Sequence, residues 1–133
     1  METDLIIKEI DAIHKKADVA FENKNISDYI VQFDESITYK NADATTFDKK
    51  ELINETEKYF RKTKGISTTY YRIKSAVEND IFIEKIARKS IIYIKGLLFT
   101  KKQTIQTEEI FHWKKLNAQW KVVEVEITLE EKY

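Results

Sequence analysis

The sequence predicts an α+β domain in which three N-terminal helices pack on a mainly antiparallel β-sheet. Apolar residues recur every three or four positions in residues 3–23 and 48–63, as on one side of a helix. Apolar and polar residues instead alternate in residues 105–113 and 122–129, as on the two faces of a strand. The period first changes at Asp34, and the whole segment after Gly65 is strand-like, so most strands are expected in the second half of the chain.

The composition is that of a single domain spanning residues 1–133. A chain of this length buries roughly two-thirds of the surface that it exposes when unfolded, so its core needs no disulfide. Cysteine is absent, which excludes a thiolate nucleophile and a cysteine zinc site. Lys and Arg number 23, as do Asp and Glu, so the net positive charge typical of nucleic-acid binding is missing and we expect no nucleic-acid partner.

Neither a signal peptide nor a membrane span is visible in the sequence. Residues 1–8 lack a basic start and a long apolar core, and no run approaches the roughly 18 apolar residues of a span. We therefore expect a soluble, cytoplasmic protein with no membrane partner. The two histidines, His14 and His112, lie on different predicted elements and form no metal triad. We expect neither a metal nor a cofactor.

The first predicted helix covers residues 3–23, with Thr3 or Asp4 as its N-cap. Its apolar stripe carries Ile6, Ile10, Ile13, Ala17, Ala20 and Phe21. A second, shorter helix is expected after the cap Asn25. One side of it would carry Ile26, Tyr29, Ile30 and Phe33. Because so few residues join the two helices, they must pack as a hairpin or a sharp corner.

Two short strands and a third helix follow. β-Branched and aromatic residues predict strands at 35–40 and 45–47, with a turn at 41–44. Asp48 begins the third helix and, with Glu51, resembles a capping box. Gly65 is expected to end this helix in a left-handed conformation.

The segment after Gly65 predicts strands at 68–77, 81–86 and 90–100. We expect a bend or bulge at 78–80, a turn at 87–89 and a bend of the sheet at Gly96. A helix through residues 81–95 is the alternative, since part of that segment contains good helix formers. We favour strands because residues 91–94, Ile-Ile-Tyr-Ile, prefer extended backbone.

The last third of the chain predicts two long antiparallel strands. One face of the first strand would carry Ile105, Thr107, Glu109, Phe111 and Trp113, and the other Gln106, Glu108, Ile110 and His112. In the second strand, Val123, Val125, Ile127 and Leu129 alternate with Val122, Glu124, Glu126 and Thr128. Residues 114–119 lack glycine, so the connection is expected to be longer than a two-residue turn.

Two segments resemble the NTF2-like superfamily, including its SnoaL-like polyketide cyclase and ketosteroid isomerase branches. Residues 30–39, IVQFDESITY, look like the end of that family's second helix and the acidic start of its first strand. Residues 111–113 (FHW) and 120–123 (WKVV) look like its final hairpin. The resemblance covers nearly the whole chain. It implies a strongly curved sheet wrapped around the helices, a conical cavity and often a homodimer.

The homodimer implied by this resemblance would pair through the outer face of the sheet. On that face we expect Ile110, His112, Trp120 and Val122. Exposed apolar residues in such a set suggest a partner surface. Scattered surface hydrophobic residues, which are normal, are the alternative.

The isomerase branch uses a tyrosine, an aspartate base and a protonated carboxylic acid. The resemblance places these functions at Asp18, at about Lys40 and at Glu109, so only the third carboxyl group is retained. A lysine cannot replace the carboxylate base without a large pKa shift of its own. We therefore expect no isomerase activity.

Glu109 is the candidate catalytic residue. It shares its predicted face with apolar residues, which would desolvate the carboxylate. We predict that it points into the cavity as an acid, a base or a polar anchor, in a pocket with His14, Tyr39, Phe111 and Trp113. The alternatives are a structural hydrogen bond inside, or a register shifted by one residue that places Glu109 in water.

Two classes of function follow. The first is a binding protein that holds a small apolar or amphipathic molecule in its cavity or acts as a homodimeric module. The second is a SnoaL-like enzyme that transfers protons on a ketone or polyketide-like substrate through Glu109. An open cavity with Glu109 at its base would favour the enzyme, and a plugged interior would favour a structural role. The fold hosts both classes, so the sequence leaves the choice open.

Overall fold

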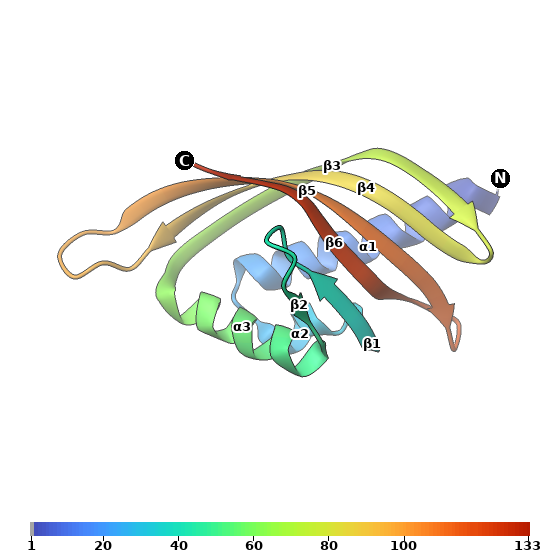
Figure 1. Ribbon diagram of the computed structural model, residues 1–133, viewed down its shortest axis with the longest axis horizontal. Helices are drawn as coiled ribbons and strands as arrows, with labels where there is room; N and C mark the ends of the chain where they lie inside the picture. The colour runs from blue at the N-terminus through green and yellow to red at the C-terminus, as the bar shows by residue number, and fades with distance from the viewer. Residues whose placement is uncertain (1) are drawn as a thin grey trace.

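The computed structural model describes residues 2–133, which form three helices and six strands. Figure 1 shows the helices gathered on one side of a curved sheet, as expected for the predicted α+β fold. In chain order the elements are α1 (Glu2–Glu22), α2 (Ile26–Ile30), β1 (Phe33–Lys40), β2 (Thr46–Phe47), α3 (Lys49–Lys62), β3 (Thr63–Glu78), β4 (Ile81–Ile94), β5 (Lys101–Leu116) and β6 (Gln119–Lys132).

The strands form one open sheet in the order β2-β1-β6-β5-β4-β3. All neighbours are antiparallel except β1 and β6, which run parallel. The sheet is therefore mixed, with the mainly antiparallel character that the sequence predicts. The four long strands β3 to β6 arch over the helices (Figure 1), and the strand prediction for residues 81–95 is confirmed over Ile81–Ile94.

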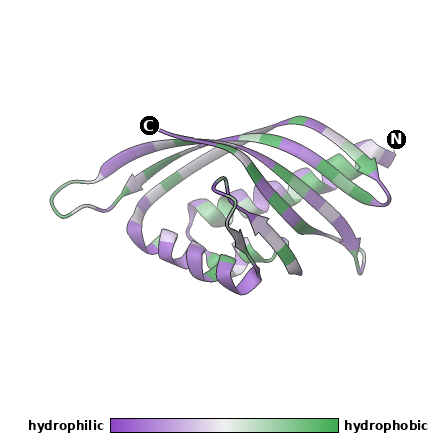
Figure 2. Ribbon diagram, viewed as in Figure 1, coloured by the Kyte–Doolittle hydropathy of each residue, from purple (hydrophilic) through white to green (hydrophobic). Residues whose placement is uncertain are grey.

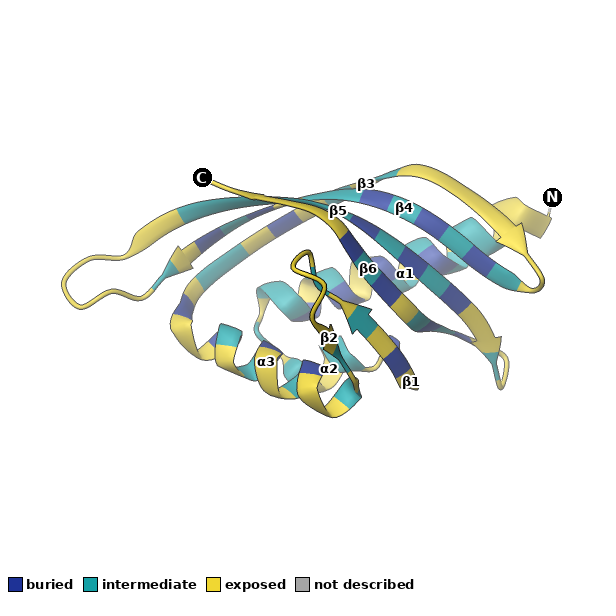
Figure 3. Cartoon of the chain, in the orientation of Figure 1, coloured by how far each residue is buried: buried dark blue, intermediate teal, exposed yellow. Residues whose placement is uncertain are grey.

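Helix α1 lies against the inner, concave face of the sheet. Of the predicted stripe, Ile10, Ala17 and Ala20 are buried and Ile6, Ile13 and Phe21 are half-buried, while His14 is buried beside them. Figure 3 shows the buried positions of the long strands alternating with less buried ones. The predicted cap of α2 is also confirmed, since the side chain of Asn25 accepts a hydrogen bond from the backbone of Asp28. Phe33, expected on α2, instead begins β1.

Helix α3 begins as predicted and ends earlier than predicted. The capping box is present: the Asp48 side chain accepts from the Glu51 backbone at 2.8 Å, and Glu51 accepts from the Asp48 backbone at 3.1 Å. The helix ends at Lys62, and Thr63 is already extended. Gly65 lies inside β3 and has no positive φ, so its predicted role as a left-handed stop is wrong.

Tight turns without glycine form two of the three connections between the long strands. Asn79 and Asp80 connect β3 to β4, and Asn117 and Ala118 connect β5 to β6, all four with positive φ. Two consecutive residues of this kind form the two-residue turn that matches the twist of a hairpin. The prediction of a longer loop at 114–119 is therefore wrong, and the bend expected at 78–80 is a hairpin turn.

Strand β4 runs unbroken through residues 87–89, where the sequence analysis predicted a turn. Its inner face carries Phe82, Glu84, Ile86, Arg88, Ser90 and Ile92. The strand stops at Ile94, so the prediction of strand to residue 100 is too long. Residues 95–100 form a loop, in which the missing side chain of Gly96 lets the carbonyl group of Phe99 approach closely.

A β-bulge in β6 reverses the predicted outward orientation of Trp120 and Val122. The pairing of β5 with β6 shifts between His112 and Trp113, so Val123 is a bulge. Trp120 and Val122 consequently face the helices, with 9 % and 0 % exposure, and belong to the core cluster. Their predicted place on an outer dimer face is wrong.

The core lies between α1 and the inner face of β4, β5 and β6. Its buried members include Ile10, Phe82, Ile86, Trp113 and Val125. Figure 2 shows hydrophobic and hydrophilic residues alternating along these strands, which is why one face is apolar. No helix within residues 2–133 is long and apolar enough to cross a membrane.

Candidate functional site

A cavity of about 250 Å³ lies between the helices and the inner face of the sheet, bordered also by β1. Aromatic side chains make up much of its apolar lining, with Phe21, Phe33, Phe47 and Phe111 among them. Tyr29, Tyr39 and Tyr59 add three phenol rings from α2, β1 and α3. Apolar walls with a few convergent polar groups are typical of a small-molecule site.

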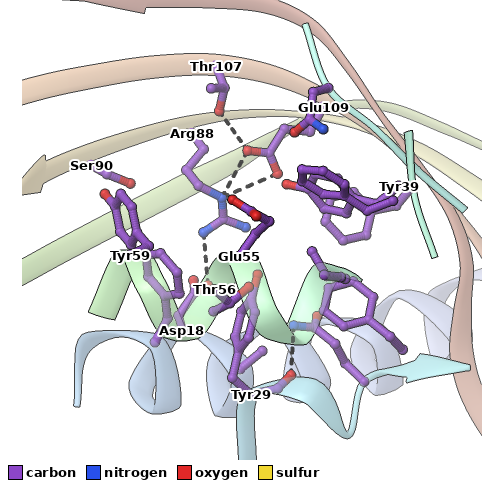
Figure 4. Close-up of a pocket in the computed structure, with 18 of the residues that line it drawn as sticks. Asp18, Tyr29, Tyr39, Glu55, Thr56, Tyr59, Arg88, Ser90, Thr107 and Glu109 are labelled. Atoms are coloured by element: carbon purple, nitrogen blue, oxygen red, sulfur yellow. Dashed lines mark hydrogen bonds and ion pairs between the residues drawn. The ribbon is translucent and has the colours of Figure 1, made fainter. Parts of the chain in front are cut away.

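Arg88 of β4 connects the cavity to α1 and β5. Its Nη1 donates to Asp18 Oδ1 at 2.9 Å and to Thr68 Oγ1 at 3.2 Å, and its Nε lies 3.4 Å from both carboxylate oxygens of Glu109. Figure 4 shows the guanidinium between these two carboxylates. We call Asp18, Arg88 and Glu109 the open cluster, because all three line the cavity.

Glu109 occupies the inner face of β5, as its alternation predicts. In addition to Arg88, its partner is Thr107, whose hydroxyl donates to Oε2 at 2.6 Å. A cation and a hydroxyl thus compensate the buried carboxylate, which suits the polar-anchor version of the hypothesis. Its role in proton transfer stays a prediction.

Burial disfavours the charged forms of both Asp18 and Arg88, but the neighbouring charges outweigh it only for Arg88. It raises the pKa of Asp18 above its ordinary value of 3.8, although the neighbouring Arg88 partly opposes this. Burial also disfavours the charged form of Arg88, but Glu109 and Asp18 more than offset it, so the pKa of Arg88 is raised. Arg88 therefore stays positively charged, and Asp18 takes up a proton more readily than an exposed aspartate does.

The three cavity tyrosines remain protonated hydrogen-bond donors at neutral pH. Burial raises the pKa of Tyr59 to about 12 and also raises the pKa values of Tyr29 and Tyr39. Figure 4 shows the three side chains around the head of Arg88. Within residues 2–133 none of the three hydroxyls has a hydrogen-bond partner. Unused phenol groups beside a cavity are available to a ligand.

The structure divides the predicted pocket residues between two places. Tyr39 and Phe111 line the cavity with Glu109, whereas His14 and Trp113 do not. His14 Nε2 instead donates to Glu84 Oε2 at 2.7 Å, and Trp113 Nε1 donates to the same oxygen at 2.6 Å. The expected contact between His14 and Glu109 is thus replaced by one between His14 and Glu84.

Glu84 is the centre of a second buried cluster. Its side chain is fully buried, and Arg72 Nε donates to Oε1 at 2.9 Å. Arg72 Nη2 also donates to Asp11 of α1 at 2.6 Å. We call Asp11, His14, Arg72 and Glu84 the closed cluster. The ring of His14 is packed between Tyr70, Phe111 and Trp113, with centroids 4.6 to 5.3 Å away, so side chains fill the surrounding space.

Sequence reasoning missed Glu84 and Arg88, although a signal for both exists. The alternation that singled out Glu109 also places Glu84 between Phe82 and Ile86 on an apolar face. Arg88 continues the same face two positions later. It was overlooked because residues 87–89 were assigned to a turn.

The remaining predicted residues lie on the outer face of β5. Ile110 and His112 are half-buried and pair with Lys85 and Ile83 of β4. Among residues 2–133, no group of three His, Cys, Asp or Glu side chains is arranged to hold a metal ion.

Solved structures with the same fold are numerous. A scytalone dehydratase-like protein from Novosphingobium aromaticivorans matches with a TM-score of 0.85 and 14% identity, over 99% of this chain and 91% of that one. A ketosteroid isomerase-like protein from Erwinia carotovora atroseptica matches with a TM-score of 0.72 and 16% identity, over 90% and 92%. An NTF2-like protein from Cytophaga hutchinsonii matches with a TM-score of 0.67 and 17% identity, over 96% and 98%.

Sequence comparison adds no closer relative. No protein-family model matches the chain, and no curated protein matches it. Identities of 14% to 17% show the fold alone. This fold is NTF2-like, as the resemblance in residues 30–39 and in the final hairpin implies, and its function must be argued from the site.

Proposed function

We propose that the protein binds a compact, neutral molecule with an apolar ring body and an oxygen acceptor in the cavity beside Arg88. The observation that carries this proposal is the set of three cavity hydroxyls, on Tyr29, Tyr39 and Tyr59, without partners in the described chain. These hydroxyls open onto the cavity and make no hydrogen bond within the described chain, so they are free to donate to an acceptor on a ligand that enters it. The aromatic walls suit a ring.

The charges around the cavity favour a neutral ligand over an anion. Arg88 is the one cation among the described lining residues, and Asp18 and Glu109 already neutralise it. Glu55 and Glu130 add further negative charge to the lining. A carboxylate or phosphate would meet net repulsion here, whereas a ketone or hydroxyl oxygen accepts from the tyrosines without that cost.

Two probes with one ring system test this proposal. Binding of 2-naphthol and of 2-naphthoate can be followed by chemical-shift changes of the protein. We expect 2-naphthol to bind and 2-naphthoate to bind much more weakly. Tyr39→Phe and Tyr59→Phe should each weaken the binding of 2-naphthol by roughly three- to ten-fold, because each removes one hydrogen bond.

Tyr71→Phe is the matched control, because Tyr71 is exposed on the outer face and should leave binding unchanged. Equal binding of the two probes, or no shift at residues that line the cavity, would refute the proposal.

Proton transfer on a ketone is the second candidate function, as in the SnoaL-like alternative. The raised pKa of Asp18, on the cavity wall, makes its carboxylate a stronger base than that of an exposed aspartate, as proton abstraction requires. Asp18 would take a proton from the carbon beside the ketone, and the tyrosine hydroxyls would stabilise the enolate oxygen. Glu109, the group predicted from the sequence, would then hold Arg88. The names of the scytalone dehydratase-like and ketosteroid isomerase-like structures agree with such chemistry.

Deuterium exchange into 2-tetralone distinguishes binding from proton transfer. An enzyme should speed the exchange in deuterated water, Asp18→Asn should abolish the effect, and Glu109→Gln should retain part of it. A rate that the protein leaves unchanged would exclude proton transfer while leaving the binding proposal intact.

A homodimer through the outer face of the sheet belongs to the same proposal. Ile110 and His112 remain from the predicted surface, and His112 Nδ1 is buried without a hydrogen-bond partner in the described chain. Ile83 and Ile91 share that face. Light scattering should report a dimer that Ile110→Asp converts to a monomer, while Val31→Asp, at an exposed residue outside the sheet, should not. A monomeric wild-type protein would contradict this part.

A further inference from the structure

The loop between β4 and β5 exposes three consecutive large apolar side chains. Leu97 is fully exposed, and Leu98 and Phe99 are 83 % and 82 % exposed. We call residues 97–99 the apolar tip. Single exposed apolar residues are normal, but a run of three on one loop is a concentrated apolar patch that suggests a binding surface.

The apolar tip projects away from the rest of the domain. Figure 1 shows the β4–β5 connection extending beyond the helices at the end of the molecule opposite the N-terminus. Figure 2 shows hydrophobic residues at this connection and hydrophilic residues where β5 begins. The base of the loop is held in place, because the backbone of Lys95 donates to the carbonyl of Lys62 at 2.9 Å.

Positive charge surrounds the apolar tip. Lys95, Lys101 and Lys102 flank it and are exposed. Between Glu84 and Glu108 every charged residue is Lys or Arg, although the whole chain has no net charge. The contact with Lys62 also brings the basic end of α3, Arg61 and Lys62, to the base of the loop. The end of the domain that carries the tip is therefore locally basic.

We propose that the apolar tip inserts into the surface of a membrane that contains anionic lipids. Apolar residues that reach the acyl boundary, flanked by lysines at the level of the headgroups, are the arrangement that binds such surfaces. Lys95, Lys101 and Lys102 beside the apolar tip match the negative charge of an anionic lipid surface. A fluid lipid layer surrounds a projecting tip on every side.

This inference concerns a different region from the cavity. None of the residues 97–99 lines the cavity, so either proposal can fail without the other. The expectation of no membrane partner rests on the absence of a long apolar span in the sequence. Insertion of a loop requires only a few apolar residues and neighbouring basic ones, and residues 95–102, KGLLFTKK, supply both.

Co-sedimentation with vesicles tests the proposal on the full chain. The protein should sediment with phosphatidylcholine vesicles that contain phosphatidylserine, and much less with phosphatidylcholine alone. Replacing Lys95, Lys101 and Lys102 together by Gln should weaken binding by about one hundred-fold, since each basic residue contributes roughly five-fold near an anionic surface. Added salt should weaken it as well.

A triple substitution of the tip, Leu97→Ser with Leu98→Ser and Phe99→Ser, should reduce binding at least about ten-fold, because less apolar surface enters the membrane. These residues are exposed, so circular dichroism and the melting temperature should not change. Tyr71→Ser, which removes an exposed apolar side chain from the sheet, is the matched control and should bind normally.

Phe99→Trp provides a direct reporter of insertion. The emission of the introduced tryptophan should shift to the blue with anionic vesicles and be quenched by brominated lipid, while Trp113 and Trp120 stay buried in the core. Absence of sedimentation with anionic vesicles would overturn the proposal. So would an oligomer that the triple serine variant dissociates, since the tip would then be a contact between proteins.

Discussion

The closed and open clusters contain the same kinds of residue but differ in what surrounds them. In each, an aspartate of α1 pairs with a sheet arginine that also binds a glutamate of the inner face. In the closed cluster, His14 and Trp113 complete the contacts of Glu84. In the open cluster, Arg88 borders a cavity. A buried carboxylate therefore indicates function only when space for a ligand lies beside it.

The acids of the two clusters also shift in opposite directions. Burial raises the pKa of Glu84, but His14, Arg72 and Trp113 outweigh it, so this pKa falls below 4.5. Burial dominates for Asp18, whose pKa rises above 3.8. Folding therefore favours the charged form of Glu84, which stabilises the fold. Folding disfavours the charged form of Asp18 in the open cluster.

The largest expected effect is a loss of stability when the glutamate of either cluster is replaced by glutamine. Glu84→Gln should lower the free energy of unfolding by about 3 kcal/mol, because it breaks a fully buried ion pair. Glu109→Gln should cost only about 1 kcal/mol, since Arg88 keeps Asp18 and borders the cavity. Urea denaturation measures both. If both variants lost the same free energy of unfolding, the cavity beside Arg88 would not make the loss of Glu109 less costly than the loss of Glu84.

The next effect is on the pH dependence of stability, where the two acids should act with opposite sign. The contribution of Glu84 is present above pH 4.5 and is lost as the pH falls through its lower folded-state pKa. The contribution of Asp18 is full below pH 3.8 and is lost as the pH rises through its higher folded-state pKa.

Denaturation curves at several pH values should separate these contributions. Glu84→Gln should flatten the loss of stability in acid. Asp18→Asn should remove the decrease in the free energy of unfolding that Asp18 causes as the pH rises above 3.8. The difference in stability between this variant and the wild type should therefore be smaller in acid. A change of the same sign in both variants would contradict the assigned shifts.

Much of the fold was predictable because its signals are local. The stripe of α1, the Asn25 cap and the box of Asp48 with Glu51 depend on residues within a few positions of each other. Glu109 was found for a similar reason, since alternation along one strand was enough to place it inward.

The errors come from backbone features that the sequence marks weakly. Asn79-Asp80 and Asn117-Ala118 adopt positive φ without glycine, so neither hairpin turn was expected to be tight. The misplaced turn at 87–89 concealed Arg88, and the bulge at Val123 turned Trp120 inward. The pairing of Asp18 with Arg88 joins residues 70 positions apart and follows only from the assembled fold.

The smallest expected effect concerns one hydroxyl from each region. Tyr70 donates to Asp11 of the closed cluster at 3.2 Å, whereas the hydroxyl of Tyr39 in the cavity has no partner among residues 2–133. Tyr70→Phe should therefore lower the free energy of unfolding by about 0.5–1 kcal/mol, and Tyr39→Phe should leave it unchanged. Thermal and urea unfolding measure the difference. If Tyr39→Phe were the more costly change, its hydroxyl would already be engaged in the free protein and would not be available to a ligand.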